Sequence, residues 1–265
     1  MTGEIQFETD GPLALVTLSH AGKLNAMSRD MWRELRALFL RIQASTQWRC
    51  VIVRGEGGTF CAGGDISEYP GFRFDEAGLR HFHEVEVWGG LQAMLDCDVP
   101  LVAQIEGACM GAGLEIASCC DIRLADASAK FGAPIAKLGF PMAPREAQLV
   151  ARAAGLLTVR EMLLQAAVLD AGQMQQRGFL NRVIGGGQVR QEALEGARRI
   201  AALAPQAARA NKRLLRAFSG ENQASVPAPR AQDATEIIAN AYRYADGPEH
   251  REGIAAFLQK RKPAF

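Results

Sequence analysis

The stretch 99–121 constrains the fold most, because an apolar run, a group of small residues and a helix-like run follow one another there. Pro100 introduces the apolar run, and a proline in this place favours the start of a buried strand over the inside of a helix. Three small residues, 111–113, precede a segment of helical composition over 114–120. The sequence therefore predicts a strand that passes through a tight turn into a helix.

The predicted turn has the features of a site for developing negative charge. The first N–H groups of a helix lack partners within it, and the positive end of the helix dipole lies there. Glu115 is the only carboxylate between Gly107 and Asp121, and it falls on the first turn of the predicted helix. A proton-transfer group beside a stabilised oxyanion is a catalytic arrangement, so this stretch is the candidate active site.

Composition narrows the class of protein. The chain has 265 residues and 48% hydrophobic content, which is enough for a substantial core. Its 30 Lys and Arg residues nearly balance 29 Asp and Glu, and a net charge of +1 favours neither nucleic acid nor a membrane surface as partner. We expect no targeting or membrane-spanning segment. The six scattered cysteines form no ligand cluster, which predicts buried thiols, no metal site and a cytoplasmic location.

Strand and helix patterns alternate along the chain. Up to residue 131 they predict a hairpin over 5–18, a helix from a cap at Ser28 to about Gln43, a strand over 50–53, a mostly helical segment over 76–95 and strands over 122–125 and 129–131. Beyond residue 145 they predict helix caps at Thr158 and Asp170, a strand at 183–184, and three or four helices over 188–265, with breaks at Pro205, 219–229 and 247–248.

Four ordered blocks resemble the crotonase family, the enoyl-CoA hydratase/isomerase superfamily. Residues 24–28 (LNAMS) are similar to its NAL-S segment, and 60–66 (FCAGGDI) to its F-x-A-G-A/G-D loop. Residues 107–121 resemble its G-x-x-x-G-G-G-x-E block with the following Cys-Asp pair, and the tail 252–261 resembles its EG…AF-x-x-[KR] pattern. The resemblance spans nearly the whole chain.

This resemblance implies an α/β fold with a crotonase-like spiral of repeated ββα units. The spiral would occupy residues 1–187 and hold the CoA and catalytic site. Residues 188–265 would form a helical region through which the chain assembles into a homotrimer or a dimer of trimers.

The resemblance also implies an acyl-CoA enzyme that adds water to an α,β-unsaturated acyl-CoA through an oxyanion-stabilised enolate. The family's two oxyanion-hole amides fall on Gly64 and Ala112, and its proton-transfer glutamate falls on Glu115. Coenzyme A is part of the substrate, and no permanently bound cofactor is expected. The positions that correspond to CoA contacts are Ala26, Ala62, Asp65, Ile66, Ser67, Phe257 and Lys260.

The chain departs from the family at the second glutamate of hydratases, where Ile135 stands. Glu146 in the following altered segment is a candidate replacement, but its neighbour Arg145 favours its interpretation as a solvated ion pair. Hydration is the first interpretation, because Glu115 takes the water-activating position. Isomerisation or other single-glutamate enolate chemistry stays open, and a noncatalytic CoA-binding protein is the alternative of another class.

The remaining polar candidates have simpler interpretations. His81 and His83 are expected to be ordinary helix residues, and Tyr69 is expected to pack within its loop. Asp65 is expected to close its own loop by hydrogen bonding, and Asp121 is expected to have a structural role.

Overall fold

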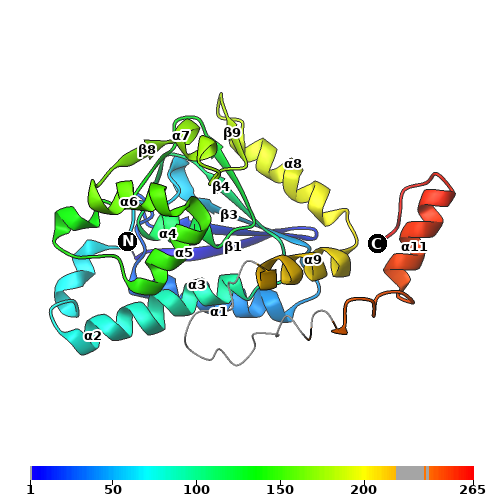
Figure 1. Cartoon of the computed structure of the whole chain (residues 1–265), viewed down its shortest axis with the longest axis horizontal. Helices are drawn as coiled ribbons and strands as arrows, with labels where there is room; N and C mark the ends of the chain where they lie inside the picture. The colour runs from blue at the N-terminus through cyan, green and yellow to red at the C-terminus, as the bar shows by residue number, and fades with distance from the viewer. Residues whose placement is uncertain (1, 219–235, 237–238) are drawn as a thin grey trace.

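A six-stranded sheet crosses the centre of the molecule in the computed structural model, which describes residues 2–218, 236 and 239–265 (Figure 1). Its strand order is β1-β2-β3-β4-β6-β9, and all neighbours are parallel except the β1–β2 hairpin. A smaller sheet has the order β5-β7-β8. The strands are β1 (Glu4–Asp10), β2 (Leu13–Ser19), β3 (Cys50–Gly55), β4 (Leu101–Ile105), β5 (Ala108–Met110), β6 (Ile122–Asp126), β7 (Lys130–Gly132), β8 (Val168–Asp170) and β9 (Arg182–Ile184).

Among the described residues, the α-helices are α1 (Arg29–Ala44), α2 (Glu76–His81), α3 (Trp88–Leu95), α4 (Ala112–Ser118), α5 (Pro144–Ala154), α6 (Leu156–Leu164), α7 (Ala171–Gln176), α8 (Val189–Ala201), α9 (Pro205–Phe218) and α11 (Pro248–Leu258). Within this part of the chain, two strands precede a helix three times, in β1-β2-α1, β4-β5-α4 and β6-β7-α5, whereas β3, β8 and β9 are each followed by helices alone. The short turns are η1 (Glu56–Gly58), η2 (Ile66–Gly71), η3 (Phe82–Val87) and η4 (Ile135–Leu138). Within the described ranges, no helix is both long and apolar enough to cross a membrane.

The large sheet is covered on both faces, which explains its nearly continuous apolar strands. Val51 and Val53 face the main core, where α1, α3 and α4 pack. Cys50 and Ile52 face the opposite side, where they meet the small side chains of α8. This alternation follows from the two-residue period of a strand.

Local signals in the sequence predicted most of these elements. The hairpin, the strands and the Ser28 cap are confirmed; the Ser28 hydroxyl accepts a 3.2 Å bond from the N–H of Met31. Asp170 forms a capping box with Gln173, as predicted. The cap predicted at Thr158 is wrong: α6 begins at Leu156, and Thr158 is buried within it. The predicted break over 219–229 lies outside the described residues, and the division at residue 187 stays a prediction.

The predicted helical segment 76–95 contains an unpredicted turn of π-helix. Helices α2 and α3 continue into one another through η3, which has one residue more per turn than an α-helix. Such turns rotate the preceding part of a helix relative to the following part. This rotation bears on where His83 points.

Candidate active site

A cavity of about 340 Å³ lies between the loops that follow the central strands and the helices α4 and α5. Its walls come from the 62–69 loop, η3, the 110–115 turn and the 134–146 segment. Most of the lining is apolar and includes the rings of Trp32, Phe82 and Phe140. A largely apolar pocket with few polar groups is the usual form of a small-molecule site.

Two loops are brought together at the floor of this cavity by a short backbone pairing. Cys61 donates from its N–H to the carbonyl of Ala108 (2.8 Å), and Met110 donates to the carbonyl of Cys61 (2.9 Å). Gly64 and Ala112, which follow these two positions, both line the cavity. Among the described residues, neither of their backbone N–H groups has an acceptor. Both N–H groups are therefore available for an oxygen atom of a ligand.

Glycines permit this close approach of the two loops. Gly111 has φ +47°, in the left-handed region, and a Cβ placed there would lie 3.6 Å from Cα of Gly63. A Cβ at Gly113 would lie only 2.6 Å from the carbonyl oxygen of Cys61. The strand, turn and helix predicted over 99–121 thus require small residues at this point.

Two buried glutamates face the cavity. Glu115 lies on the first turn of α4, as predicted, and Glu146 lies on the first turn of α5. Burial raises the pKa of Glu115 well above its ordinary value, and the nearby Glu146 raises it further. Burial also raises the pKa of Glu146 to about 8, although Arg73 acts in the opposite direction. At least one of these two carboxyl groups can therefore be protonated near neutral pH.

The interpretation of Glu146 as a solvated ion pair with Arg145 is wrong. Glu146 is 4% exposed and its Oε1 lies 2.7 Å from Nδ1 of His83. Arg145 instead pairs with Glu84, at 3.3 Å. The structure thus places a second carboxyl group in the cavity, from α5 and not from the position of Ile135.

His83, Arg73 and Tyr69 also line the cavity, and the sequence interpretation had not placed them there. Nε2 of His83 lies 3.3 Å from Nη1 of Arg73. The Arg73 guanidinium lies 3.6 Å from the ring centroid of Phe140 and 4.6 Å from that of Tyr69. Burial raises the pKa of the Tyr69 hydroxyl to about 12, so this group stays protonated. The position of Tyr69 in the loop after Gly64 made it a possible lining residue, although packing within the loop was favoured; no local pattern pointed to Arg73 or His83.

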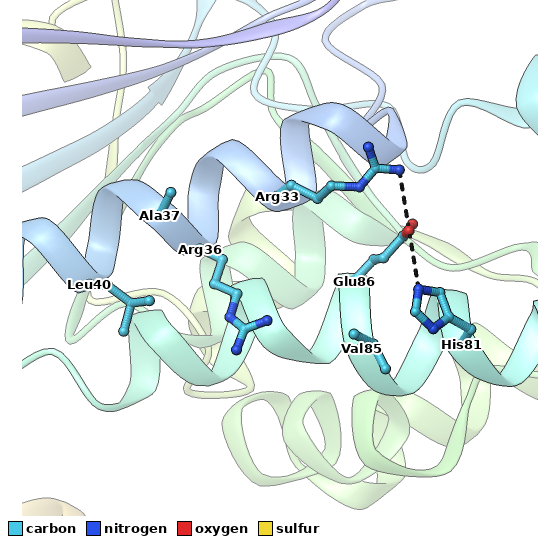
Figure 2. Close-up of a pocket in the computed structure, with 7 residues that line it drawn as sticks. All are labelled: Arg33, Arg36, Ala37, Leu40, His81, Val85 and Glu86. Carbon is cyan, nitrogen blue, oxygen red and sulfur yellow. Dashed lines mark hydrogen bonds and ion pairs between the residues drawn. The ribbon is translucent and has the colours of Figure 1, made fainter.

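An ion-pair cluster holds η3 against α1 on the side away from the cavity. Figure 2 shows Glu86 between Arg33 and His81, at 3.3 and 3.7 Å. Arg29 completes the cluster with two 2.7 Å bonds to the Glu86 carboxylate. Because Glu86 points toward α1, the π-turn directs His83 toward α5. His81 lies in the hollow of Figure 2, outside the cavity.

The positions predicted to contact CoA separate into four groups, three of which lie near the loops of the cavity. Ala62 and Ile66 line the cavity with Gly64. The carboxylate of Asp65 accepts from the N–H of Ser67 in its own loop (3.1 Å) and from Lys23 of the loop before α1 (2.6 Å). Ala26 is buried and, like Ser67, lies outside the cavity lining.

The two tail positions are far from the cavity of their own chain. Phe257 on α11 is 81% exposed, and Lys260 follows the end of that helix. Figure 1 shows α11 at the edge of the molecule beyond α8 and α9, whereas α2, α4 and α5 lie on the other side. The structure therefore does not bring Phe257 and Lys260 to the site.

The structure also bears on the predictions for the cysteines and for Asp121. All six cysteines are free and buried, as predicted. Asp121 has the structural role expected of it, because its carboxylate accepts from the N–H of Leu101 and pairs with Lys212, both at 2.7 Å. Within the part of the chain that the structure describes, no three His, Cys, Asp or Glu side chains are grouped as metal ligands.

Comparisons with known proteins show the family to which the chain is similar. A family model described as enoyl-CoA hydratase/isomerase matches residues 8–265. A probable enoyl-CoA hydratase of Rhizobium meliloti is 29% identical over 259 residues, which cover 97% of this chain and 96% of that protein. The 2,3-dehydroadipyl-CoA hydratase of Escherichia coli is 30% identical over 251 residues, which cover 95% and 94%.

The crystal structure of an enoyl-CoA hydratase/carnithine racemase from Magnetospirillum magneticum matches with a TM-score of 0.89 and 36% identity. The match covers 100% of this chain and 96% of that one, and it confirms the crotonase-type α/β fold expected from the sequence blocks. The chain belongs to the enoyl-CoA hydratase/isomerase family.

Proposed function

We propose that this protein adds water to the double bond of an α,β-unsaturated acyl-CoA, with Glu115 and Glu146 as its two proton-transfer groups. The observation that carries this proposal is that both carboxyl groups line the cavity that also contains the free N–H groups of Gly64 and Ala112. Family membership supports a CoA thioester as substrate.

Each requirement of hydration has a group in this cavity. The Gly64 and Ala112 amides would hold the thioester oxygen as it gains negative charge, and such preorganised donors are a large source of rate enhancement. One carboxylate accepts a proton from water as its oxygen bonds to Cβ, and a carboxyl group gives a proton to Cα. The pKa values of both Glu115 and Glu146 are raised, which suits a pair in which one carboxyl group is protonated and the other can accept a proton.

The position of Glu146 supports hydration over the alternatives that Ile135 had left open. Isomerisation needs only one carboxyl group, which removes a proton at one carbon and returns it at another. The burial of Glu146 beside the same cavity supplies the second group that hydration needs. We therefore rank hydration above isomerisation and above noncatalytic CoA binding.

The test follows the ultraviolet absorbance of conjugated enoyl thioesters, which hydration abolishes. We expect Glu115→Gln and Glu146→Gln each to lower kcat by about two to four orders of magnitude, because each removes a general acid or base. Glu161→Gln is the matched control, since Glu161 pairs with Arg177 outside the cavity.

Three results would contradict the proposal in different ways. If Glu146→Gln hydrated enoyl thioesters at the wild-type rate, Glu146 would not be needed and Glu115 alone would carry out the proton transfers. Migration of the double bond without water addition would favour isomerisation. Tight CoA binding without turnover of any enoyl thioester would favour the noncatalytic alternative.

We further propose a trimer, or a dimer of trimers, in which α11 meets a neighbouring copy. Ile254, Phe257 and Leu258 on this helix are 54%, 81% and 73% exposed, a large apolar surface for a monomer to leave in water. CoA contact by Phe257 and Lys260 would then belong to the site of that copy. Sedimentation velocity tests this, and a monomer at micromolar concentration would refute it. A cytoplasmic location stays a prediction.

A further inference from the structure

The two neighbours of His83 determine which of its ring nitrogens carries the proton. Its Nε2 lies 3.3 Å from Nη1 of Arg73, and a guanidinium nitrogen only donates, so Nε2 accepts. Nδ1 of the neutral ring then carries the proton and donates it to Oε1 of Glu146, at 2.7 Å. Burial and the positive charge of Arg73 lower the pKa of His83, which keeps the ring neutral.

The two cavity glutamates differ in what supports their negative charge. Glu146 accepts a hydrogen bond from His83 and lies in the field of Arg73. The carboxylate of Glu115 has no hydrogen-bond donor among the described residues. A bond from a donor favours the ionised form of a carboxyl group, whereas burial without a donor favours the neutral form.

The other charged and titratable groups around Glu146 do not alter this order. Glu84 opposes its ionisation but is itself paired with Arg145, at 3.3 Å. Tyr69 stays protonated. Lys137 of η4 lines the same cavity and adds positive charge. Glu146 is thus the first member of the pair to lose its proton as pH rises.

We propose that Arg73 and His83 act as positioning residues that make Glu146 the base and leave Glu115 as the acid. This inference rests on the hydration proposed above and assigns its roles opposite to the first interpretation, in which Glu115 activates water. Oε1 of Glu146 is engaged by His83, which leaves Oε2 to receive a proton.

Every proton is accounted for in the proposed hydration step. An O–H bond of water breaks and its proton goes to Glu146, while the water oxygen bonds to Cβ. The electron pair of the double bond moves to the thioester enolate, held by the amides of Gly64 and Ala112. Glu115 then gives its proton to Cα. Transfer of a proton from Glu146 to Glu115 after product release restores the starting state.

The first test titrates the unliganded enzyme by infrared spectroscopy, with the carboxyl band of Glu146 assigned by its loss in Glu146→Gln. We expect His83→Leu to move the protonation of Glu146 to higher pH by about one to two units, the worth of a hydrogen bond to a charged group. His83→Asn, which places an N–H near the position of Nδ1, should return most of this shift. Glu161→Gln is the control, because Glu161 pairs with Arg177 outside the cavity. An unchanged Glu146 band in His83→Leu would refute the positioning role, whether or not any enoyl thioester is hydrated.

The second test follows kcat/KM against pH in the same variants. Activity should rise as Glu146 loses its proton, and this acidic limb should move to higher pH in His83→Leu and back in His83→Asn. A merely structural role for His83 would lower kcat without moving the limb. That outcome would overturn the inference while leaving hydration in place.

The third test separates the roles of the two glutamates. Exchange of the Cα protons of a saturated acyl-CoA with deuterium oxide needs the Cα group and the amide donors, but no attack by water. We expect Glu146→Gln to retain this exchange, and Glu115→Gln to lower the exchange rate by at least about tenfold. The reverse pattern would assign the base role to Glu115 and contradict the inference.

Discussion

The Tyr69 hydroxyl oxygen leaves no space for a side chain at Gly64. A Cβ placed on this residue would lie 2.4 Å from the Tyr69 hydroxyl oxygen, and 3.4 Å from the next ring atom. We expect Gly64→Ala to displace the ring or the Gly64 amide and to lower kcat/KM by about two orders of magnitude, the usual effect of losing one oxyanion donor. Tyr69→Phe removes the oxygen, so the double variant Gly64→Ala/Tyr69→Phe should recover much of that loss.

A double-mutant cycle in the absorbance assay measures this coupling. Tyr69→Phe alone is the matched control for any role of the hydroxyl in binding. Purely additive effects of the two substitutions would show that the clash does not displace the donor.

Glu146 shows why residue-level inference from sequence has limits. Arg145 is its chain neighbour, and this proximity suggested an ion pair at the surface. Consecutive helix residues point about 100° apart, however, and do not face one another. The partner of Glu146 is His83, which is 63 positions away in the chain. No local pattern joins residues so distant, whereas the amides of Gly64 and Ala112 lie within sequence blocks whose spacing was readable.

At the scale of elements, the π-turn η3 sets the direction of His83. Deletion of Val85, a 43% exposed residue within η3, would remove the extra residue and rotate α2 and His83 by about 100° relative to α3. Helix α3 stays packed on α1, so we expect His83 to leave Glu146. The variant should then show the displaced acidic limb of His83→Leu in its kcat/KM profile.

Val85→Ala is the control for this deletion, because it keeps the length of the turn. Circular dichroism and the denaturation midpoint establish that each variant is folded. A folded deletion variant with the wild-type pH profile would mean that η3 does not aim His83.

Helix caps and strands were predictable to the extent that their causes are local. Ser28 and Asp170 each accept a hydrogen bond from the N–H three residues further on, and short-range patterns describe such contacts well. Thr158 has the same local pattern, but Gly155 (φ +83°) ends α5 and lets α6 begin earlier. No local pattern marks the π-turn, and the Arg29 of α1 that bonds to its Glu86 is 57 positions away in the chain.

At the scale of the whole molecule, the fold supplies the site by joining loops from separate ββα units. The sequence blocks around Gly64 and Ala112 predicted the crotonase-type fold and one wall of the cavity. The opposite wall, from η3 and α5, depends on how helices pack across the sheet and could not be read from spacing. Arg73 and His83 are therefore the polar groups that only the structure revealed, whereas Glu146 was a candidate in the sequence whose burial beside His83 was not foreseen.

The burial of the glutamate pair predicts how stability of the whole molecule depends on pH. The pKa of Glu146 is about 8 in the fold against 4.5 in its ordinary state, and that of Glu115 is also raised. Between these two values the unfolded chain releases a proton that the folded chain keeps, so the free energy of unfolding falls as pH rises. The loss is about 1.4 kcal/mol per pH unit for one such group, and the stabilisation is complete only below the ordinary pKa. Glu115→Gln/Glu146→Gln has no proton to release, so we expect its urea midpoint to fall much less between pH 5 and pH 8, whereas Glu161→Gln should follow the wild-type slope. A double variant as pH-sensitive as the wild type would show that the two carboxyl groups are ionised in the folded protein.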